Sequence, residues 1–407
     1  MKTRQLHAFP IPTSSNRTVP AVSTPLDRWL LDRLRGSVAA ARVRFRLWDG
    51  FELSPAAAEP VGAICFNSRR ALLTCAWDPE LNFGEMYMSG AVEVHGDLVA
   101  TLSEIYRALP HATSRPWWLR QRSNDVHAAK ENVHRHYDLG NAFYRLWLDR
   151  EMAYTCAYFP TPAATLEEAQ IAKMRRIGWK LRLQPEERVL DAGCGWGGLA
   201  LLLAREFGVT VRAFNLSAEQ VAFARERARA EGLTDRVEFI EDDYRNVSGR
   251  YDAFVSVGML EHVGLADYAT LGSVIDRSLM PEGRGLLHFI GRNRPGALNP
   301  WIRRRIFPGA YPPTLAETVD GVFAPWAFSV TDVENLRPHY AATLEHWRRR
   351  FDAAAGEVAA MFDEVFVRAW RLYLAGSQAA FITGAMQLFQ VVFARGGTNR
   401  LPWTRVE

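Results

Sequence analysis

The sequence predicts an α/β protein built on a doubly wound, mostly parallel sheet, with a smaller α+β domain towards its N-terminus. Three observations lead to this prediction. Strand-like and helix-like segments alternate over residues 188–291, as in a series of βαβ units. The first strand of this series ends in a glycine-rich turn, GCGWGG at 193–198, which leads into an apolar helix. Short strand and helix patterns fill residues 25–110.

Composition limits the classes of protein to consider. With 407 residues, of which 48% are hydrophobic and 23% charged, the chain is long enough for two or three globular domains. No apolar run reaches the roughly 18 residues of a transmembrane helix, and the basic N-terminus lacks the apolar stretch of a secretory signal. The net charge of +4 gives little support to nucleic-acid binding, and the four cysteines have no metal-like spacing. We therefore expect a globular protein with no nucleic-acid partner and no metal site.

The N-terminal part is divided into three segments. Residues 1–24 are rich in Pro, Ser and Thr, which predicts a flexible lead-in. Residues 111–130 form a linker in which Trp117 and Trp118 lie among arginines, a composition that suits either a membrane interface or packing between domains. Between them, residues 25–110 form the small α+β domain. Its predicted elements are a helix at 26–35, two strands around a turn at Asp49–Gly50, strands within 61–68 and 91–98, and a helix at 98–109.

The second domain, residues 131–407, carries the α/β series. An amphipathic helix at 166–182 precedes the first strand, which ends at Asp191. The later predicted elements are strands at 209–216, 237–243, 251–260 and 283–291, and helices at 218–232 and 268–283, the last closed by a Pro-Glu-Gly turn. Beyond Asn299 we expect mostly helices, including 362–393, whose apolar tract suits either a buried core or an apolar channel. The alternation predicts a parallel sheet with helices on both faces.

Polar residues and glycines gather where the predicted strands end, and such ends are where α/β sheets bind ligands. The four groups are Asp191 with the glycine turn, Asn215, Asp242–Asp243–Tyr244, and Glu261–His262. Gly193, Gly195 and Gly198 allow positive φ and a close approach of a ligand to the backbone. The helix that follows presents unpaired N–H groups towards that ligand. The pattern predicts a nucleotide site.

A dinucleotide is disfavoured at this site. Dinucleotide sites usually carry an acid after the second strand, where it holds the ribose, and a GxGxxG turn. Here Asn215 follows the second strand, and the turn is GCGWGG. A hydride-transfer enzyme is therefore less consistent with the sequence than one that uses a methyl donor, which carries a nucleoside and an amino acid but no pyrophosphate.

Five motifs, DAGCGWGG, LSAEQ, DDYR, SVGMLEHVG and QLFQVVFARGG, together resemble the cyclopropane-fatty-acyl-phospholipid synthase family. The resemblance extends over about residues 136–395, and more loosely over the N-terminal domain. It implies a Rossmann-like methyltransferase sheet with helical lipid-binding additions, and S-adenosylmethionine as the methyl donor. It also implies the reaction. A cis double bond of a phospholipid acyl chain attacks the sulfonium methyl, and a base, thought to be a bound bicarbonate ion, removes a proton so that a cyclopropane ring closes.

The resemblance also implies the residues that hold the bicarbonate ion. They are Cys156 in YTCAYF, Glu261 in MLEHVG, His288 and the Ile290 backbone in LLHFIG, and Tyr340 in RPHYAATL. Such an ion needs hydrogen-bond partners in a water-poor pocket, where each polar contact is worth more than in water. Taken singly, a histidine or a cysteine such as His288 or Cys156 is more often a buried core residue. Glu261 is a charge at the end of an apolar strand, and burying it without a partner would be costly.

The implied contacts to the methyl donor follow the same motifs. Tyr137, Tyr154 and Thr155 match positions at the methionine part, and Asp191, Gly193 and Gly195 line the site nearby. Gln220 is expected to reach the ribose beside Asn215, and Asp243 and Tyr244 to flank the adenine, with Asp242 as the alternative partner for its amino group. Two positions depart from the family pattern. Asn215 stands where a threonine is more usual, and Ile382 replaces an arginine near the lipid end.

Ring formation is the leading prediction, with two alternatives. The same fold can leave a methyl-branched or methylene acyl chain without ring closure. A lipid-binding protein with an inactive methyltransferase domain is the other alternative, and the intact glycine turn and Glu261 disfavour it. We expect the substrate to be unsaturated phospholipid chains at a membrane surface. Because this substrate lies in a bilayer and no segment spans one, we expect a cytoplasmic protein, peripheral to the inner face of the membrane. By resemblance, we expect a homodimer, with residues 25–110 serving dimerisation or docking.

Overall fold

The computed structural model describes residues 22–55, 59–109 and 139–397, which form two compact units. The first unit comprises the described residues within Met1–Thr113, together with Asn299–Ile306 and Leu344–Thr383. The second comprises those within Ser114–Leu298, Phe307–Thr343 and Gly384–Glu407. The lead-in at 1–24, apart from its last three residues, and the linker at 111–130 lie outside the described residues. The domain limits given above stay a prediction.

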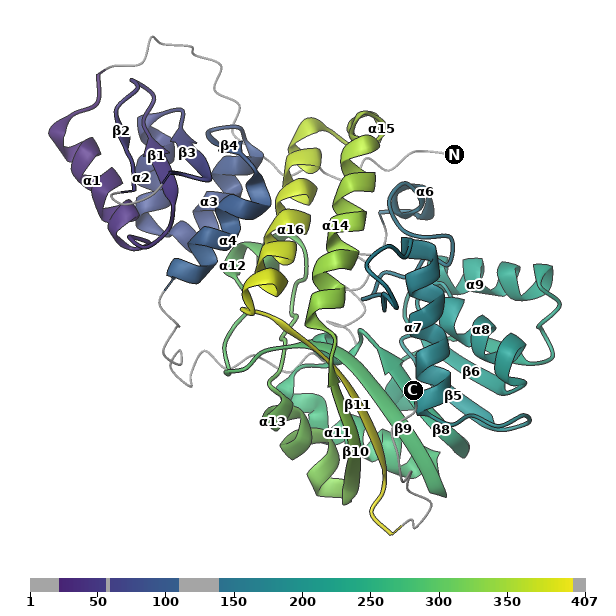
Figure 1. Ribbon diagram of the computed structural model, residues 1–407. Helices are drawn as coiled ribbons and strands as arrows, with labels where there is room; N and C mark the ends of the chain where they lie inside the picture. The colour runs from purple at the N-terminus through teal and green to yellow at the C-terminus, as the bar shows by residue number, and fades with distance from the viewer. Residues whose placement is uncertain (1–21, 56–58, 110–138, 398–407) are drawn as a thin grey trace. The chain divides into compact units, whose positions relative to one another are not determined.

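The first unit is built on a four-stranded sheet with the order β2-β1-β3-β4 (Figure 1). The strands are β1 (Val43–Arg46), β2 (Glu52–Leu53), β3 (Gly62–Phe66) and β4 (Val92–Gly96). β1 and β3 are parallel, and the other two pairs are antiparallel. The predicted turn between β1 and β2 is confirmed, with Gly50 at φ +92°. Its mixed sheet and flanking helices agree with the α+β pattern.

Eight helices of the first unit pack around this sheet and each other, within the part of the chain that the structure describes. The sequence predicted α1 (Pro25–Gly36), α4 (Leu98–Ala108) and, in general terms, the helices beyond Asn299, whereas α2 (Arg69–Trp77) and α3 (Pro79–Met88) lie in a stretch to which no element was assigned. The later ones are α12 (Pro300–Arg305), α15 (Ala355–Met361), α16 (Glu364–Thr383) and the C-terminal part of α14 (Arg337–Ala353). α16 packs on α3 and α4, and Arg368 donates to the Tyr87 carbonyl at 2.6 Å.

The second unit contains a seven-stranded sheet with the order β10-β11-β9-β8-β5-β6-β7 (Figure 1). The strands are β5 (Arg188–Ala192), β6 (Thr210–Asn215), β7 (Val237–Glu241), β8 (Tyr251–Val257), β9 (Leu279–Gly291), β10 (Phe328–Asn335) and β11 (Gln387–Arg395). β5 to β9 pair in parallel, and β11 joins β9 and β10 in antiparallel fashion. The predicted doubly wound, mostly parallel, Rossmann-like sheet is confirmed.

Helices cover both faces of this sheet, and alternate strand residues supply two separate cores. Val189 and Val255 belong to the core under α7 (Leu166–Lys180), α8 (Gly198–Phe207) and α9 (Ala218–Ala230). Their neighbours Leu190 and Phe254 belong to the core under α11 (Tyr268–Ser278) and the turn at 319–323. Successive side chains of a strand point to opposite faces, so the apolar runs predicted as buried strands fill both cores.

Two expectations for the second unit were wrong. The QLFQVVF segment, expected within a helical tract, is strand β11, and β10 also interrupts the helices. Eight of the nine residues of β11 are buried, so its sequence lacks the alternation that distinguishes a strand from a buried helix. The Pro-Glu-Gly segment, expected to end a helix, lies within β9. The strand begins before this segment, at Leu279, which pairs with Tyr251 of β8.

The remaining helices of the second unit are short. They are α6 (Asn141–Arg145), α10 (Leu260–Val263) and α13 (Leu315–Thr318), together with the N-terminal turns of α14. α6 and α10 flank the ends of the sheet that carry the predicted site. Among all helices of the described ranges, none combines the length and the apolar character needed to span a membrane.

Candidate functional site

A pocket lies at the carboxyl ends of β5, β6, β7 and β8, as expected for an α/β sheet. Its wall comes from the loop before α7, α7 itself, the turn after β5 with the start of α8, the end of β6 with the start of α9, the turn after β7, and the stretch from β8 into α10. Ten of the eleven predicted donor-binding residues line it: Tyr154, Thr155, Asp191, Gly193, Gly195, Asn215, Gln220, Asp242, Asp243 and Tyr244. The eleventh, Tyr137, lies outside the described residues.

The glycine turn brings backbone close to the pocket. Positive φ occurs at Gly193 (+86°), Gly195 (+55°) and Gly197 (+84°). The prediction of positive φ at Gly198 was wrong, since its neighbour Gly197 takes that conformation instead. Gly198 is needed for space, because a Cβ there would lie 3.0 Å from the Glu151 carbonyl oxygen. At Gly197 a Cβ would lie only 2.6 Å from the Phe239 ring.

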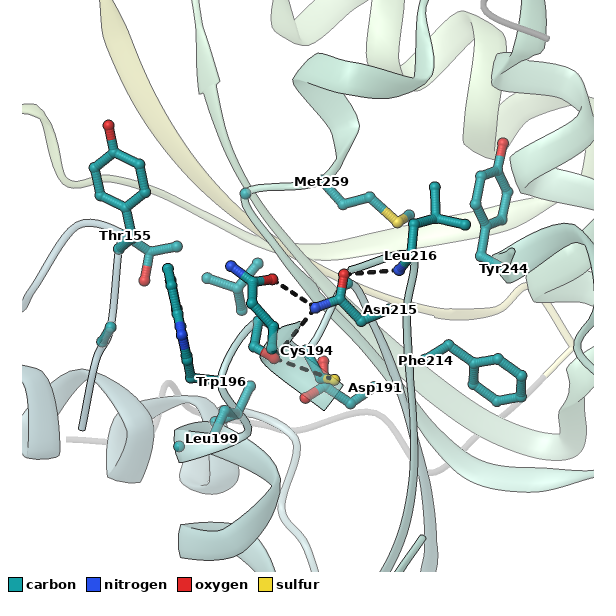
Figure 2. A pocket seen from close by; sticks show the side chains of 18 of the residues that line it. Thr155, Asp191, Cys194, Trp196, Leu199, Phe214, Asn215, Leu216, Tyr244 and Met259 are labelled. Atoms are coloured by element: carbon teal, nitrogen blue, oxygen red, sulfur yellow. Dashed lines mark hydrogen bonds between the residues drawn. The ribbon is translucent and has the colours of Figure 1, made fainter. Parts of the chain in front are cut away.

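Asn215 organises the end of β6. Its Nδ2 donates to Gln220 Oε1 at 2.6 Å and to the Gly195 carbonyl at 3.2 Å, and its Oδ1 accepts from Leu216 N at 2.8 Å (Figure 2). Gln220 is buried, and its Nε2 has no hydrogen-bond partner among the described residues. Asn215, which stands where the family more often has threonine, therefore holds the Gln220 side chain through its Oε1 and leaves the Gln220 amide N–H groups unused.

The turn after β7 presents two acidic side chains, both already engaged. Asp242 Oδ1 accepts from Asp243 N at 2.7 Å and from Asn246 Nδ2 at 2.8 Å. Asp243 Oδ1 accepts from Arg245 N at 2.9 Å, and its carboxylate lies 3.5 Å from the Arg245 guanidinium. Tyr244, which follows them in the sequence, is buried. In Figure 2, Tyr244 and Met259 lie towards one side of the pocket, and Trp196 and Thr155 lie towards the other. Both acids line the pocket, so the two alternatives for the adenine contact remain open.

Asp191 and Lys173 form the deep, charged part of the pocket. Asp191 is 1% exposed, and its Oδ2 has no hydrogen-bond partner among the described residues. Burial raises the pKa of its carboxyl to about 7, although the Lys173 ammonium opposes this rise. Lys173, on α7, is 3% exposed and donates to Thr155 Oγ1 at 2.9 Å. Burial lowers its pKa to about 8.

Lys173 was missed in the sequence analysis, although a signal was present. The helix at 166–182 is amphipathic, and Lys173 lies on the same side as Gln170 and Ile177, which are fully buried. A lysine within the apolar stripe of a helix is rarely buried without a partner. Trp196 and Met259 were also missed among the pocket residues, since apolar side chains beside a turn carry no chemical signature.

Two buried groups on neighbouring elements make the second part of the site. Glu261, on α10, is 5% exposed; its Oε1 accepts from Ile290 N at 2.7 Å, and its Oε2 has no partner among the described residues. Burial raises the pKa of this carboxyl to about 7. His288, on β9, is 2% exposed and pairs in register with Val257 of β8. Its Nδ1 accepts from Gln390 Nε2 at 3.2 Å, which leaves the ring proton on Nε2, where it has no described partner.

Cys156 and Tyr340 meet at the Leu336 carbonyl. Cys156 Sγ lies 3.9 Å from this oxygen and donates to the Ala157 carbonyl at 3.1 Å, while Tyr340 N donates to the Leu336 carbonyl at 3.2 Å. Leu336 N in turn donates to Leu388 O, and Leu388 pairs with Ile290 across β11 and β9. Burial raises the pKa of the Cys156 thiol, so it stays protonated. Hydrogen bonds and strand pairing thus connect all the predicted bicarbonate ligands except His288, which lies two residues from Ile290.

Comparison with known proteins identifies the family of this chain. The family model described as mycolic acid cyclopropane synthetase matches residues 124–391. A probable fatty acid methyltransferase of Pseudomonas putida is 38% identical over 380 residues, 89% of this chain and 95% of that protein. The cyclopropane-fatty-acyl-phospholipid synthase of Escherichia coli K12 is 40% identical over 335 residues, 79% of this chain and 85% of that protein. The crystal structure of mycolic acid cyclopropane synthase CmaA1 with SAH and CTAB aligns with a TM-score of 0.62 and 31% identity, over 65% of this chain and 98% of that one.

Proposed function

This chain belongs to the mycolic acid cyclopropane synthetase family of S-adenosylmethionine-dependent methyltransferases, and on that premise we propose that it forms cyclopropane rings on phospholipid acyl chains. The reacting carbon comes from the sulfonium methyl of S-adenosylmethionine. The π electrons of a cis double bond form the new C–C bond as the C–S bond breaks, and the donor leaves as a thioether. The carbon next to the site of attack becomes cationic. Loss of a proton from the transferred methyl then closes the ring.

The observation that carries this proposal is a pair of buried, unused polar atoms. Glu261 Oε2 can accept one hydrogen bond and His288 Nε2 can donate one, and neither has a partner among the described residues. Leaving such groups unpaired costs about 1–3 kcal/mol each, so a bound polar species is favoured. Bicarbonate fits this donor set, since its hydroxyl can donate to Glu261 while its other oxygens accept from His288. When bound there, it would supply the base for the methyl proton.

The protein groups proposed to surround this ion keep fixed protonation states. Burial lowers the pKa of His288 well below its ordinary value, so the imidazole stays neutral and donates through Nε2. Burial also keeps the Cys156 thiol protonated, and its single S–H donates to the Ala157 carbonyl, so its sulfur packs against the ion without donating to it. Glu261, held by the Ile290 N–H, acts as the acceptor that orients the ion. None of these side chains is needed as the base itself.

The donor is proposed to occupy the pocket between the glycine turn and Tyr244. The unused amide N–H of Gln220 is suited to a ribose hydroxyl, and the φ values of Gly193 and Gly195 bring backbone against the methionine part. Thr155, whose neighbour is Cys156, connects this pocket to the proposed bicarbonate site. The methyl would therefore be delivered next to the base.

The direct test is product analysis. Purified protein is incubated with S-adenosylmethionine, bicarbonate and vesicles of a phospholipid with defined cis-monounsaturated chains, and the fatty acid methyl esters are analysed by gas chromatography and mass spectrometry. A new ester that is heavier by one CH2 and takes up no hydrogen under mild conditions, because it has no double bond left, supports ring formation. Absence of any added carbon on every unsaturated lipid tested contradicts the proposal.

A second product is favoured by one comparison. The Pseudomonas putida relative, which covers most of both chains, is named a probable fatty acid methyltransferase. The same cation yields a methylene chain if a hydride first shifts from the methylated carbon to the cationic one, so that the carbon bearing the methyl becomes cationic and loss of a methyl proton forms a C=CH2 bond. A separate hydride-donating reductant is then needed to convert this chain into a methyl branch. The chromatogram separates a ring from a methylene isomer, because only the methylene product takes up hydrogen under mild conditions.

The cellular setting that we propose is a membrane surface. The substrate chains are part of a bilayer, so the protein is proposed to act as a peripheral, cytoplasmic protein on the inner face of the membrane, and as a homodimer. Exposed tryptophans on the first unit, Trp29 and Trp77, are consistent with docking of this kind. Sedimentation equilibrium and vesicle co-sedimentation test the two parts separately.

A further inference from the structure

The loop at 156–159 is held on helix α14 by two side chains of that helix. Thr343 Oγ1 accepts from Ala157 N at 3.0 Å, and His339 Nδ1 accepts from Phe159 N at 3.1 Å. The loop and the helix each carry one of the proposed bicarbonate ligands. The two contacts therefore decide how these ligands lie relative to each other.

The His339 contact depends on the protonation of the ring. An imidazole nitrogen accepts from an N–H only while it carries no proton, and Nδ1 is the acceptor for Phe159 N. A second proton on the ring would therefore place an N–H donor against the Phe159 N–H. The ring is half-buried and stacks on Tyr158 at 4.7 Å, and the Arg176 guanidinium carbon lies 4.5 Å from the centroid of the same Tyr158 ring.

The charged groups around His339 favour its neutral form. On β10, Glu334 would attract an imidazolium, but it already pairs with Arg176 and Lys180 of α7, each at 2.7 Å. Asp332 pairs with Lys180 at 3.0 Å, so the two acids and two bases balance. An imidazolium would add a charge to this balanced group. Burial, opposed by Glu334 and aided by Arg176, lowers the pKa of His339 below its ordinary value of 6.5.

We propose that His339 is a positioning residue, which holds the loop on α14 while its ring is neutral, so that acid releases the loop and separates Cys156 from Tyr340. This inference rests on the proposed function, in which both residues surround the base. The lowered pKa gives the direction of the effect. The contact is complete above about pH 6.5 and is lost as the pH falls through the pKa of the folded protein.

The other contacts that hold residues 155–157 persist in acid. Gln170 Nε2 donates to the Thr155 carbonyl at 2.9 Å, and neither group titrates. Lys173 donates to Thr155 Oγ1 at 2.9 Å, and its pKa of about 8 keeps it charged at lower pH. The Thr343 hydroxyl does not titrate either. Within the described part of the loop, acid therefore acts on the His339 contact while its neighbours stay in place.

Two variants separate the acceptor from its titration. His339→Asn offers an acceptor oxygen near the position of Nδ1 and does not titrate, whereas His339→Leu removes the acceptor at every pH. On vesicles at pH 8, we expect kcat of the asparagine variant to stay within about threefold of wild type and kcat of the leucine variant to fall about tenfold or more. The ratio of asparagine variant to wild type should rise by about threefold or more at pH 5.

This ratio removes the effect of other groups that titrate in the same range. Burial raises the pKa of Asp149, which accepts from Ala153 N at 3.0 Å, to about 6, and that of Glu261 to about 7. Both groups, and the bicarbonate in solution, are the same in each variant and cancel. His95→Asn is the control, since His95 is an exposed residue of β4 whose Nδ1 also contacts a donor, Arg46 Nη2, at 3.2 Å. It should follow wild type at both pH values.

Hydrogen exchange of the Phe159 amide gives a second measurement that needs no catalysis. At one pH the intrinsic exchange rate is the same in all variants, so rate ratios report opening of the loop. By mass spectrometry of overlapping peptides, we expect about tenfold faster exchange in His339→Leu than in wild type at pH 8. Wild type should match His339→Asn at pH 8 and exchange about threefold or more faster than it at pH 5.

A ratio of His339→Asn to wild type that stays constant with pH, in either measurement, overturns the proposal. So does an unchanged exchange rate of the Phe159 amide in His339→Leu. If the leucine variant does not fold by circular dichroism, the comparison of His339→Asn with wild type decides alone. The expected exchange pattern in a wild-type protein that adds no carbon to any lipid would support the loop contact and contradict the proposed function.

Discussion

Asp191 is a residue whose function conflicts with stability. Burial raises the pKa of its carboxyl from 3.8 to about 7, so without a ligand the folded state holds a proton that the unfolded state releases above about pH 4. The protonated group is therefore compatible with folding at low pH, and stability is lost as the pH rises towards 7. The gap corresponds to at most about 4 kcal/mol, at about 1.4 kcal/mol per pH unit. A bound α-ammonium would offset this loss.

Asp191→Asn should therefore stabilise the ligand-free protein and impair donor binding. We expect a higher melting temperature than wild type at pH 8, a much smaller difference at pH 5, and at least tenfold weaker binding of S-adenosylhomocysteine, consistent with loss of a charge-assisted contact. Differential scanning fluorimetry at both pH values and calorimetric titration measure these effects. A gain in melting temperature that is the same at pH 5 and pH 8 would show that ionisation of Asp191 is not its cause.

Glu261 should affect turnover and not donor binding. It lies outside the wall of the donor pocket, and its Oε1 is held by the Ile290 N–H. Glu261→Gln replaces an acceptor oxygen with a donor amide, which mismatches the bicarbonate hydroxyl. We expect kcat on vesicles to fall about 100-fold or more, as for loss of a group that serves proton transfer, with unchanged affinity for S-adenosylhomocysteine. Glu238→Gln, which alters an exposed ion pair with Arg212, is the control. Full activity of the Glu261 variant would remove the argument for the bicarbonate site.

At the scale of elements, β9 and β11 pack closely against each other beside the site. Gly285 of β9 lies opposite Phe393 of β11, and a Cβ at Gly285 would lie 2.2 Å from the Phe393 ring. Gly285→Ala should destabilise the protein by about 1–3 kcal/mol, the usual range for overpacking. Gly356→Ala, in helix α15 with no atom within 4 Å of the new Cβ, should be neutral or stabilising by up to about 1 kcal/mol. Urea unfolding of both variants checks the difference, and equal effects would contradict it.

The elements also explain where sequence reasoning succeeded and failed. β5 and β6 were predicted from short apolar runs in an alternating series of strands and helices, and the polar residues Asp191 and Asn215 at or near their ends mark the carboxyl edge of the sheet. β11 was not, because it is buried on both faces and its apolar run has no period. Lys173 was missed for a different reason. Its importance depends on which face of α7 meets the pocket, and this is decided by packing rather than by the pattern of the helix alone.

At the scale of the whole molecule, the chain folds as two units whose segments interleave. The first unit takes in Asn299–Ile306 and Leu344–Thr383, which are far in sequence from its sheet. Contacts such as the ion pair of Arg305 with Glu85 hold them there. The local sequence of these segments does not indicate which part of the chain they pack against. Domain limits are therefore harder to predict from composition than a site is from motifs at strand ends.

The first unit also bears the residues suited to meet a membrane. On α2, Trp77 is 90% exposed and Leu73 lies one turn before it, with Arg70 on the same face. On α1, Trp29 is 54% exposed, and the Arg33 guanidinium lies 5.8 Å from its ring centroid. Tryptophan and arginine together favour the interface of an anionic bilayer, where the ring enters the headgroup region and the cation meets phosphate. A surface of this kind predicts binding that is sensitive to both lipid charge and salt.

Replacing both tryptophans with serine should separate membrane docking from the chemistry. We expect the Trp29→Ser, Trp77→Ser variant to co-sediment less with vesicles that contain anionic phospholipid, by about tenfold or more, since two interfacial aromatic side chains are lost. Its affinity for S-adenosylhomocysteine should not change, because both positions lie in the first unit and the donor pocket lies in the second. Activity on vesicles should fall in parallel with binding, and added salt should weaken the wild type further. Undiminished vesicle binding by the folded variant would mean that another surface docks the protein, and a change of oligomeric state in sedimentation equilibrium would assign these tryptophans to the dimer contact instead.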